Sequence, residues 1–187
     1  MQHVAKQKVS SFREKQIRSL AREELLKANA LALPVDPIAF AERLGILVQA
    51  FDSPTVDFSG FLMQRGDSFG IGYSNAIANE GFQRFTVAHE LGHYFIDGHC
   101  EAVLKDGKHF SRSGFISKDL FEREADIFAT EFLMPWKLIQ PILKEYTRGF
   151  GAIEAISSKC ISSLVASAIR YSKVTEESVA VVVSHRG

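Results

Sequence analysis

The chain has 187 residues, and its 22 Lys and Arg balance its 22 Asp and Glu, so the formal net charge is +0. This balance gives no global reason to expect a nucleic acid or an acidic partner. The apolar share of 46%, with 15 Phe, is ample for the core of one domain with at most a small appendage. Cys100 and Cys160 form no CxxC pair, which favours reduced thiols over a disulfide framework.

The N-terminus and the hydropathy favour a cytoplasmic protein that does not associate with a membrane. The first residues are rich in Lys, Gln, Arg and Glu and lack the apolar centre of a secretory signal. No stretch approaches the roughly 18 apolar residues that a membrane span needs. We expect residues 1–32 to form an N-terminal helix or arm, because apolar residues alternate with charges between about residues 10 and 30.

A helix, a strand and a hairpin are expected next. Pro37 suits the first position of a helix that ends at Gly45, and the apolar segment 46–51 predicts a strand. Segments 58–64 and 68–74 flank a tight turn, which indicates a hairpin.

The following helix carries the most informative motif, His89-Glu90-Leu91-Gly92-His93. Residues four apart share one face of a helix, so His89 and His93 can offer their imidazoles to one ion. This is the HExxH pattern of zinc peptidases, in which the two His bind Zn²⁺ and the Glu is the general base. The surrounding residues are apolar on most faces, which predicts a buried helix, and buried His and Glu are costly unless they are paired or bound to metal.

An irregular, polar segment follows over residues 100–117 and is expected to border a cleft. His109 and Arg112 within it, together with Tyr73, are candidates for contacts to a substrate or to an oxyanion. His99, just before this segment, has the spacing of the third His in the HExxHxxGxxH pattern, although Ile96 stands where that pattern has Gly. His99 is therefore an alternative metal ligand.

A catalytic zinc needs a third protein ligand, and the helix expected over 119–134 offers carboxylates. Glu124 falls within the apolar arc of that helix and is the favoured ligand, because a buried carboxylate requires a cation. Glu122 lies at the edge of the arc and has the capping-box spacing from Asp119, so it and Glu131 are the weaker choices.

After Pro135 the sequence predicts three short helices, near 135–147, 150–158 and 162–171, and a final strand over 177–184 from its run of Val. The last two helices resemble a helix-turn-helix pair. The pattern nevertheless argues against direct nucleic-acid binding, since Arg170 and Lys173 near its end are the only basic candidates for contacts to phosphate. Packing accounts for its apolar residues, which are Ile161, Leu164, Val165, Ala168 and Ile169.

Two motifs resemble the ImmA/IrrE family of metallo-endopeptidases. One is Arg84-Phe85-Thr86-Val87-Ala88-His89-Glu90-Leu91-Gly92-His93, and the other is Glu124-Ala125-Asp126-Ile127-Phe128-Ala129 followed by Phe132-Leu133-Met134-Pro135. The resemblance extends from about Leu25 to the C-terminus.

The resemblance implies a zinc ion held by His89, His93 and Glu124, with Glu90 as the catalytic base. Asp126 occupies a position that is often Asn in the family, and a hydrogen bond from it to a ligand is plausible. The family further implies cleavage of one specific protein, usually a helix-turn-helix repressor encoded nearby.

We therefore expect a zincin-like α+β fold with a small antiparallel sheet against the HExxH helix. Residues 33–135 would form the peptidase core, and residues 136–187 would pack on it as a helical part with the final strand. The alternative function is a non-catalytic, zinc-dependent module that binds a repressor or DNA, with His99 or Cys100 as a fourth fixed ligand. A third reading is a core helix without metal, and the ligand types alone also admit Mn²⁺ or Fe²⁺.

Overall fold

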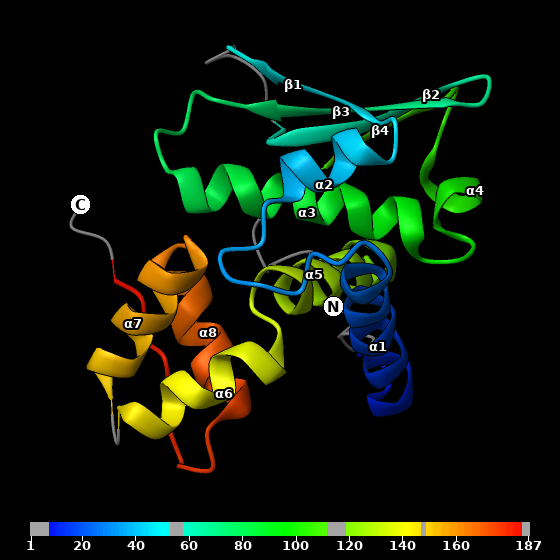
Figure 1. Cartoon of the computed structure of the whole chain (residues 1–187). Helices are drawn as coiled ribbons and strands as arrows, with labels where there is room; N and C mark the ends of the chain where they lie inside the picture. Colours follow the sequence, from blue (N-terminus) through cyan, green and yellow to red (C-terminus); the bar gives the residue numbers. More distant parts are fainter. Residues whose placement is uncertain (1–7, 53–57, 112–118, 147–148, 185–187) are drawn as a thin grey trace, which may run out of the picture.

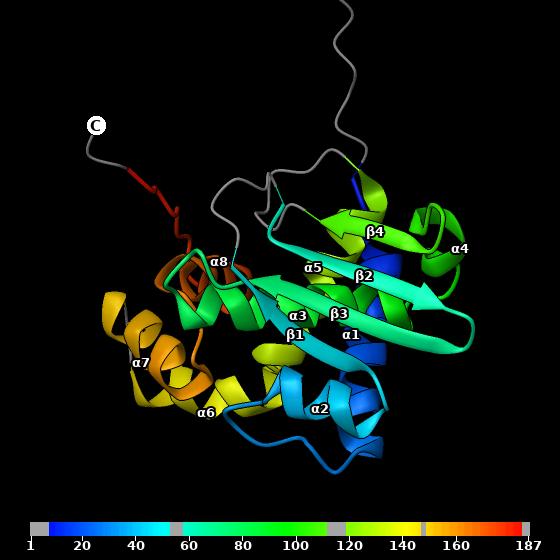
Figure 2. The same ribbon diagram turned by 90° about the horizontal axis from the view of Figure 1, so that it is seen from above.

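The computed structural model describes residues 8–52, 58–111, 119–146 and 149–184, and it confirms an α+β fold. A four-stranded sheet lies against one side of α3, and α5 packs on the other side of that helix (Figure 1). Helix α1 packs on α5, and α6, α7 and α8 gather beside the α3–α5 pair (Figures 1 and 2). Helix α3, which carries HExxH, therefore lies at the centre of the layers.

Helix α1 (Ser11–Lys27) forms within the expected N-terminal helix. The Ser10 side chain caps it by accepting a hydrogen bond from the Arg13 backbone N–H. Its buried face consists of Ile17, Ala21 and Leu25, which are spaced by one helical turn.

The sheet has the order β1-β3-β2-β4. Strands β2 (Gly60–Arg65) and β3 (Ser68–Ser74) form the predicted antiparallel hairpin. Strand β1 (Leu47–Phe51) pairs with β3 in parallel, so the sheet is mixed and not antiparallel throughout. After β1 the chain enters β2, which lies on the far side of β3. It then turns back into β3, which lies between β1 and β2 and runs in the same direction as β1. Strand β4 (Lys108–Ser111), which lies in the segment expected to be irregular, adds to the edge of β2.

Helices α3 (Glu80–Phe95) and α5 (Leu120–Leu133) pack closely at Gly92. A Cβ at this position would lie 3.0 Å from the Ala125 Cα. Helix α2 (Pro37–Arg43) begins at Pro37 as predicted and is capped by the Asp36 carboxylate, and the short α4 (His99–Val103) follows α3.

The C-terminal part contains the three predicted helices, α6 (Trp136–Glu145), α7 (Phe150–Cys160) and α8 (Leu164–Val174). The predicted final strand is wrong: no strand pairs with the described residues of 177–184, and Val182 is 88% exposed. A run of Val forms a strand only where a sheet edge is within reach, and the sheet lies on the other side of α3.

The buried face of α8 also differs from the prediction. Leu164 and Val165 are exposed, whereas Ala166, Arg170 and Tyr171 are buried. Over the described ranges, no single helix is long and apolar enough to cross a membrane, and one bent pair, α7 with α8, passes by length and composition only.

One hydrophobic core includes residues from all three expected parts of the chain. Its members include Ile17, Phe40, Leu62, Leu91, Phe128, Ile156 and Tyr171.

Candidate metal centre

Helix α3 carries His89, Glu90 and His93, three ionisable side chains that are almost fully buried at the centre of the fold. The Asn79 side chain caps the helix by accepting a hydrogen bond from the Phe82 N–H. His89, Glu90 and His93 are each at most 1% exposed, between the sheet on one side and α5 on the other. Burial of such groups costs free energy unless a partner compensates, so each side chain needs an explanation.

Glu122 of α5 lies directly against both imidazoles. Its Oε2 is 3.4 Å from the His89 Nε2, and its Oε1 is 3.2 Å from the His93 Nε2. The two Nε2 atoms are themselves 3.2 Å apart. Two imidazole nitrogens and a carboxylate oxygen therefore converge on one point, and these three residues form a group that could hold a metal ion.

The spacing of these atoms fits a tetrahedral zinc site. Ligand atoms at about 2.0–2.1 Å from a tetrahedral zinc ion lie roughly 3.3 Å from one another. The two Nε2 atoms are 3.2 Å apart, and each lies 3.2 or 3.4 Å from one of the two Glu122 carboxylate oxygens, which is close to that value. The chemistry of the donors fits as well, since imidazole and carboxylate are the ligands of catalytic zinc sites, which keep a fourth position open.

The expectation that Glu124 joins the two histidines does not match this geometry. The Glu124 Oε2 lies 2.7 Å from the Arg13 Nη2 and 3.1 Å from the His99 Nε2. Residues two apart on a helix point about 200° from each other, so Glu122 faces α3 while Glu124 does not. The signal that identifies Glu122 is Asp126, which follows it by one helical turn on the same face.

Asp126 orients the first histidine. Its Oδ1 lies 2.9 Å from the His89 Nδ1, the ring nitrogen that does not face Glu122. This contact favours the tautomer of His89 that leaves Nε2 free to bind a cation.

His99 lies behind the second histidine and outside the convergent group. The His99 Nδ1 is 3.2 Å from the His93 Nδ1, on the opposite side of that ring from Glu122. The His99 Nε2 then contacts Glu124, so a chain of polar contacts runs from Arg13 through Glu124 and His99 to His93. The Cys100 thiol donates to the His93 backbone carbonyl, at 3.3 Å, instead of facing the Nε2 atoms.

The ionisation of the metal-free cluster places a positive charge on His89, beside two carboxylates. Burial alone lowers the pKa of His89, but hydrogen bonds to Asp126 and Glu122 outweigh it and raise this pKa to about 10. Burial lowers the pKa of His93 to about 3, which keeps that imidazole neutral. Burial favours the neutral form of Glu122, but hydrogen bonds to His109, His89 and His93 prevail, so its pKa falls well below the usual range. A divalent cation can replace the proton that His89 otherwise carries.

Glu90 is a buried acid without a well-formed hydrogen bond among the described residues. Burial raises its pKa to about 7, and the nearby Ser111 hydroxyl opposes this shift only in part. Gly60 of β2 makes room for it, because a Cβ there would lie 3.1 Å from the Glu90 Oε1 and 2.3 Å from the Thr86 Cγ2. An acid with a pKa near neutrality can both accept and donate a proton.

The four remaining candidate residues from the sequence analysis lie in different places. His109 of β4 reaches the cluster, with its Nε2 at 2.9 Å from the Glu122 Oε1. Tyr73 packs against the hydrophobic core from β3, and no described contact joins it to the histidines. Arg112 lies outside the described residues. Glu131, the other weaker ligand choice, faces arginines of α1 and α8.

One of two comparisons with known proteins identifies the family of this chain. A family model described as the IrrE N-terminal-like domain, named for the M78 peptidases, matches residues 41–150. That range contains α3, β4 and α5, and so every residue of the cluster. A comparison with curated proteins found no match. The family model covers more than half of the chain, and the chain belongs to the ImmA/IrrE family of M78 metallopeptidases.

Proposed function

We propose that this protein is a zinc-dependent endopeptidase that cleaves one specific cytoplasmic protein. The observation that supports this most directly is the convergence of His89, His93 and Glu122 beside a buried, unpaired Glu90. The proposed ligands are these two histidines and Glu122, in place of the Glu124 that the sequence favoured.

Bound zinc supplies a Lewis acid that polarises the scissile carbonyl and lowers the pKa of water towards neutrality. Glu90 accepts the proton of the water that attacks the carbonyl and then passes it to the leaving amine nitrogen. Asp126 holds the His89 ring, and His99 holds the His93 ring through its Nδ1. Removal of such supporting contacts typically costs a factor of about 10–100 in metal affinity or activity.

Strand β4 is the proposed binding edge for substrate. It pairs with β2 on one side, and its other side has no strand partner in the part of the chain that the structure describes. An extended peptide can add to such an edge through backbone hydrogen bonds. His109 lies on this strand and contacts Glu122, so it is placed to hydrogen-bond to the carbonyl that is attacked.

We propose a helix-turn-helix transcriptional repressor as the substrate, on the strength of the family resemblance. If a neighbouring gene encodes a helix-turn-helix repressor, co-expression with that repressor and detection of its fragments test this substrate class. Cleavage of an unrelated protein but not of the repressor would change the substrate and leave the peptidase mechanism standing.

The central test is the Glu90→Gln variant. It should retain zinc, because Glu90 is not among the proposed ligands, and lose cleavage, because the amide cannot accept the proton. His93→Ala should lose both zinc and cleavage. Metal content per chain and fragment yield are measured on the same preparations. Cleavage by Glu90→Gln at the normal rate would contradict the mechanism.

The competing function is a regulatory module with a closed zinc site, and one observation favours testing it. The His93 and His109 rings lie 4.5 Å apart between centroids, so His109 is near enough to act as a fourth fixed ligand. A catalytic site predicts that His109→Gln retains zinc while cleavage falls. A closed site predicts that the same variant binds zinc more weakly and that the parent protein cleaves nothing.

A further inference from the structure

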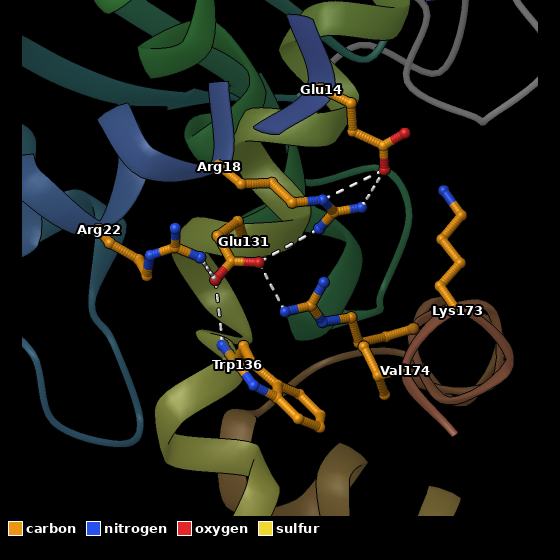
Figure 3. Close-up of a pocket in the computed structure, with 8 residues that line it drawn as sticks. Glu14, Arg18, Arg22, Glu131, Trp136, Lys173 and Val174 are labelled. Carbon is orange, nitrogen blue, oxygen red and sulfur yellow. Dashed lines mark hydrogen bonds and ion pairs between the residues drawn. The ribbon is translucent and has the colours of Figure 1, made fainter. Parts of the chain in front are cut away.

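A second buried ionic cluster lies on α5, away from the metal centre. We call it the arginine cluster and define it as Arg18, Arg22 and Arg170 around Glu131 (Figure 3). The Arg170 Nη2 lies 2.6 Å from the Glu131 Oε2, and both side chains are at most 2% exposed. The three arginines come from α1 and α8, so the cluster joins two helices that are distant in sequence.

The arginine cluster contains more positive than negative charge. Glu131 is the one carboxylate that all three guanidinium groups contact. Arg18 also contacts Glu14, at 2.5 Å, which adds a second negative charge. Lys173 lines the same cavity and has no hydrogen bond or ion pair among the described side-chain contacts, so four cations face two carboxylates. Uncompensated charge in a partly buried place is costly, and a bound anion would remove that cost.

Donors in the cluster remain available for such an anion. Among the described contacts, Arg170 donates to Glu131 only through Nη2, and its buried Nε–H has no acceptor. Arg22 likewise uses only Nη1. Guanidinium groups with free N–H bonds suit the oxygen atoms of a phosphate, which they can bind through two parallel hydrogen bonds.

The cluster opens into a cavity that also has an apolar wall. The cavity is about 570 Å³ in volume, within the range of small-molecule sites. Trp136 and Val174 line it beside the charged groups, and Lys173 extends along the opposite wall towards Glu14 (Figure 3). The Trp136 backbone N–H donates to Glu131, which fixes this residue next to the arginines. An aromatic side chain beside cationic donors suits a ligand with a planar ring joined to an anionic group.

We propose that this cavity binds a small organic phosphate that carries a planar ring, with the phosphate on Arg22, Arg170 and Lys173 and the ring against Trp136. The site is separate from the metal centre and does not depend on the proposed peptidase activity. It is nevertheless built on the same helix, because Glu131 and Glu122 both belong to α5. A ligand here would tie α1 and α8 to the helix that supplies the third metal ligand.

Calorimetric titration of the full chain tests this proposal, with phenyl phosphate, inorganic phosphate and phenol as probes. Phenyl phosphate should bind at one site per chain, inorganic phosphate more weakly because it has no ring, and phenol without detectable heat. Lys173→Gln should weaken phenyl phosphate binding about tenfold, as expected for the loss of one charged hydrogen bond. Lys15→Gln, an exposed change on α1 outside the cavity, should leave it unchanged. Trp136→Leu should weaken phenyl phosphate but not inorganic phosphate.

Four results would overturn the proposal. One is the absence of saturable binding of both phosphates to the folded parent chain. Another is an equal loss in Lys173→Gln and Lys15→Gln, since this would indicate non-specific attraction. The third is loss of binding in Glu122→Ala, since this would assign the phosphate to the metal centre. An acidic peptide that binds where phenyl phosphate does not would identify the cavity as a protein-docking site and would equally reject the small-molecule ligand.

Discussion

The metal centre and the arginine cluster are two buried ionic sites on one helix, and they have opposite chemistry. In the first, two imidazoles and one carboxylate converge on a point that a cation can occupy. In the second, the N–H groups of three arginines converge on the single carboxylate of Glu131. The difference shows that burial of an acid does not by itself indicate a metal ligand, because the groups that the packed helices present decide its role.

Helix geometry explains why α5 can serve both sites. Nine residues separate Glu122 from Glu131, which corresponds to a rotation of about 180°, so the two carboxylates lie on opposite faces. Glu124 points within about 20° of Glu131, towards α1, and accordingly it contacts Arg13. One face of α5 thus completes the metal centre, while the other anchors the N-terminal helix.

The largest expected effect comes from a matched pair of substitutions on α5. Glu122→Ala removes a proposed ligand and should weaken zinc binding by more than about 100-fold, with loss of cleavage. Glu124→Ala removes contacts to Arg13 and His99 but no proposed ligand, and it should weaken zinc binding by less than about tenfold. Competition with a chromogenic chelator measures both affinities. A loss for Glu124→Ala that equals or exceeds the loss for Glu122→Ala would contradict Glu122 as the third ligand and favour Glu124.

The sequence predicts the two histidines of the centre, but it favours a different carboxylate from the one that lies against them in the structure. Spacing on one helix identifies His89 and His93 without any tertiary information. The proposed third ligand lies on another helix, α5. The apolar arc of α5 includes the face that packs on α1 as well as the face that packs on α3. The arc alone therefore favoured Glu124. The position of Asp126 against His89 would have selected Glu122, but only knowledge of how α3 and α5 pack gives that contact.

The next effect concerns folding stability at the arginine cluster. Glu131→Gln leaves buried guanidinium groups without a counter-charge and should lower the free energy of unfolding by about 3–5 kcal/mol. The control is Glu145→Gln, since Glu145 pairs on the surface with Lys159 at 3.6 Å and should change stability by at most about 1 kcal/mol. Urea denaturation followed by circular dichroism compares the two. A similar, small loss in both variants would mean that the cluster is already well solvated.

A smaller effect is expected at the support of the first histidine. Asp126→Asn removes the charge that orients His89 and should reduce zinc affinity by about 10–100-fold, while the fold is retained. The chelator competition used for Glu122→Ala gives the affinity, and the melting temperature of the metal-free protein gives the control. An unchanged affinity would show that the packing of the ring alone fixes its orientation.

The smallest effect should come from the contact that links α1 to the metal centre. Arg13 is 37% exposed at its side chain, so its ion pair with Glu124 is partly solvated. Arg13→Gln should cost less than about 1 kcal/mol of unfolding free energy, far less than Glu131→Gln. The same urea titration measures it. A loss as large as that of Glu131→Gln would erase the distinction between the two faces of α5.

Three other features were beyond reach of the sequence for a shared reason. Strand β4 is short and polar, and pairing with β2 makes it a strand. The Val run over 179–183 has high strand propensity but no partner in the described part of the sheet. The sequence offered Arg170 as a weak candidate for contact with DNA. In the structure Arg170 is buried against Glu131 and is not available at the surface. Each depends on a distant neighbour, which local patterns do not specify.

The close approach of α3 and α5 at Gly92 has a consequence for which ions the centre accepts. Main-chain atoms of Ala125 limit how near the two helices can come, and no side chain at residue 92 holds them further apart. The distance between the proposed ligands on α3 and the carboxylate on α5 therefore depends on the backbone separation of the two helices. A backbone separation changes less easily than a side-chain rotamer. A cation with longer coordination bonds would require the two core helices to move apart. We therefore expect the close packing at Gly92 to favour small cations at this centre.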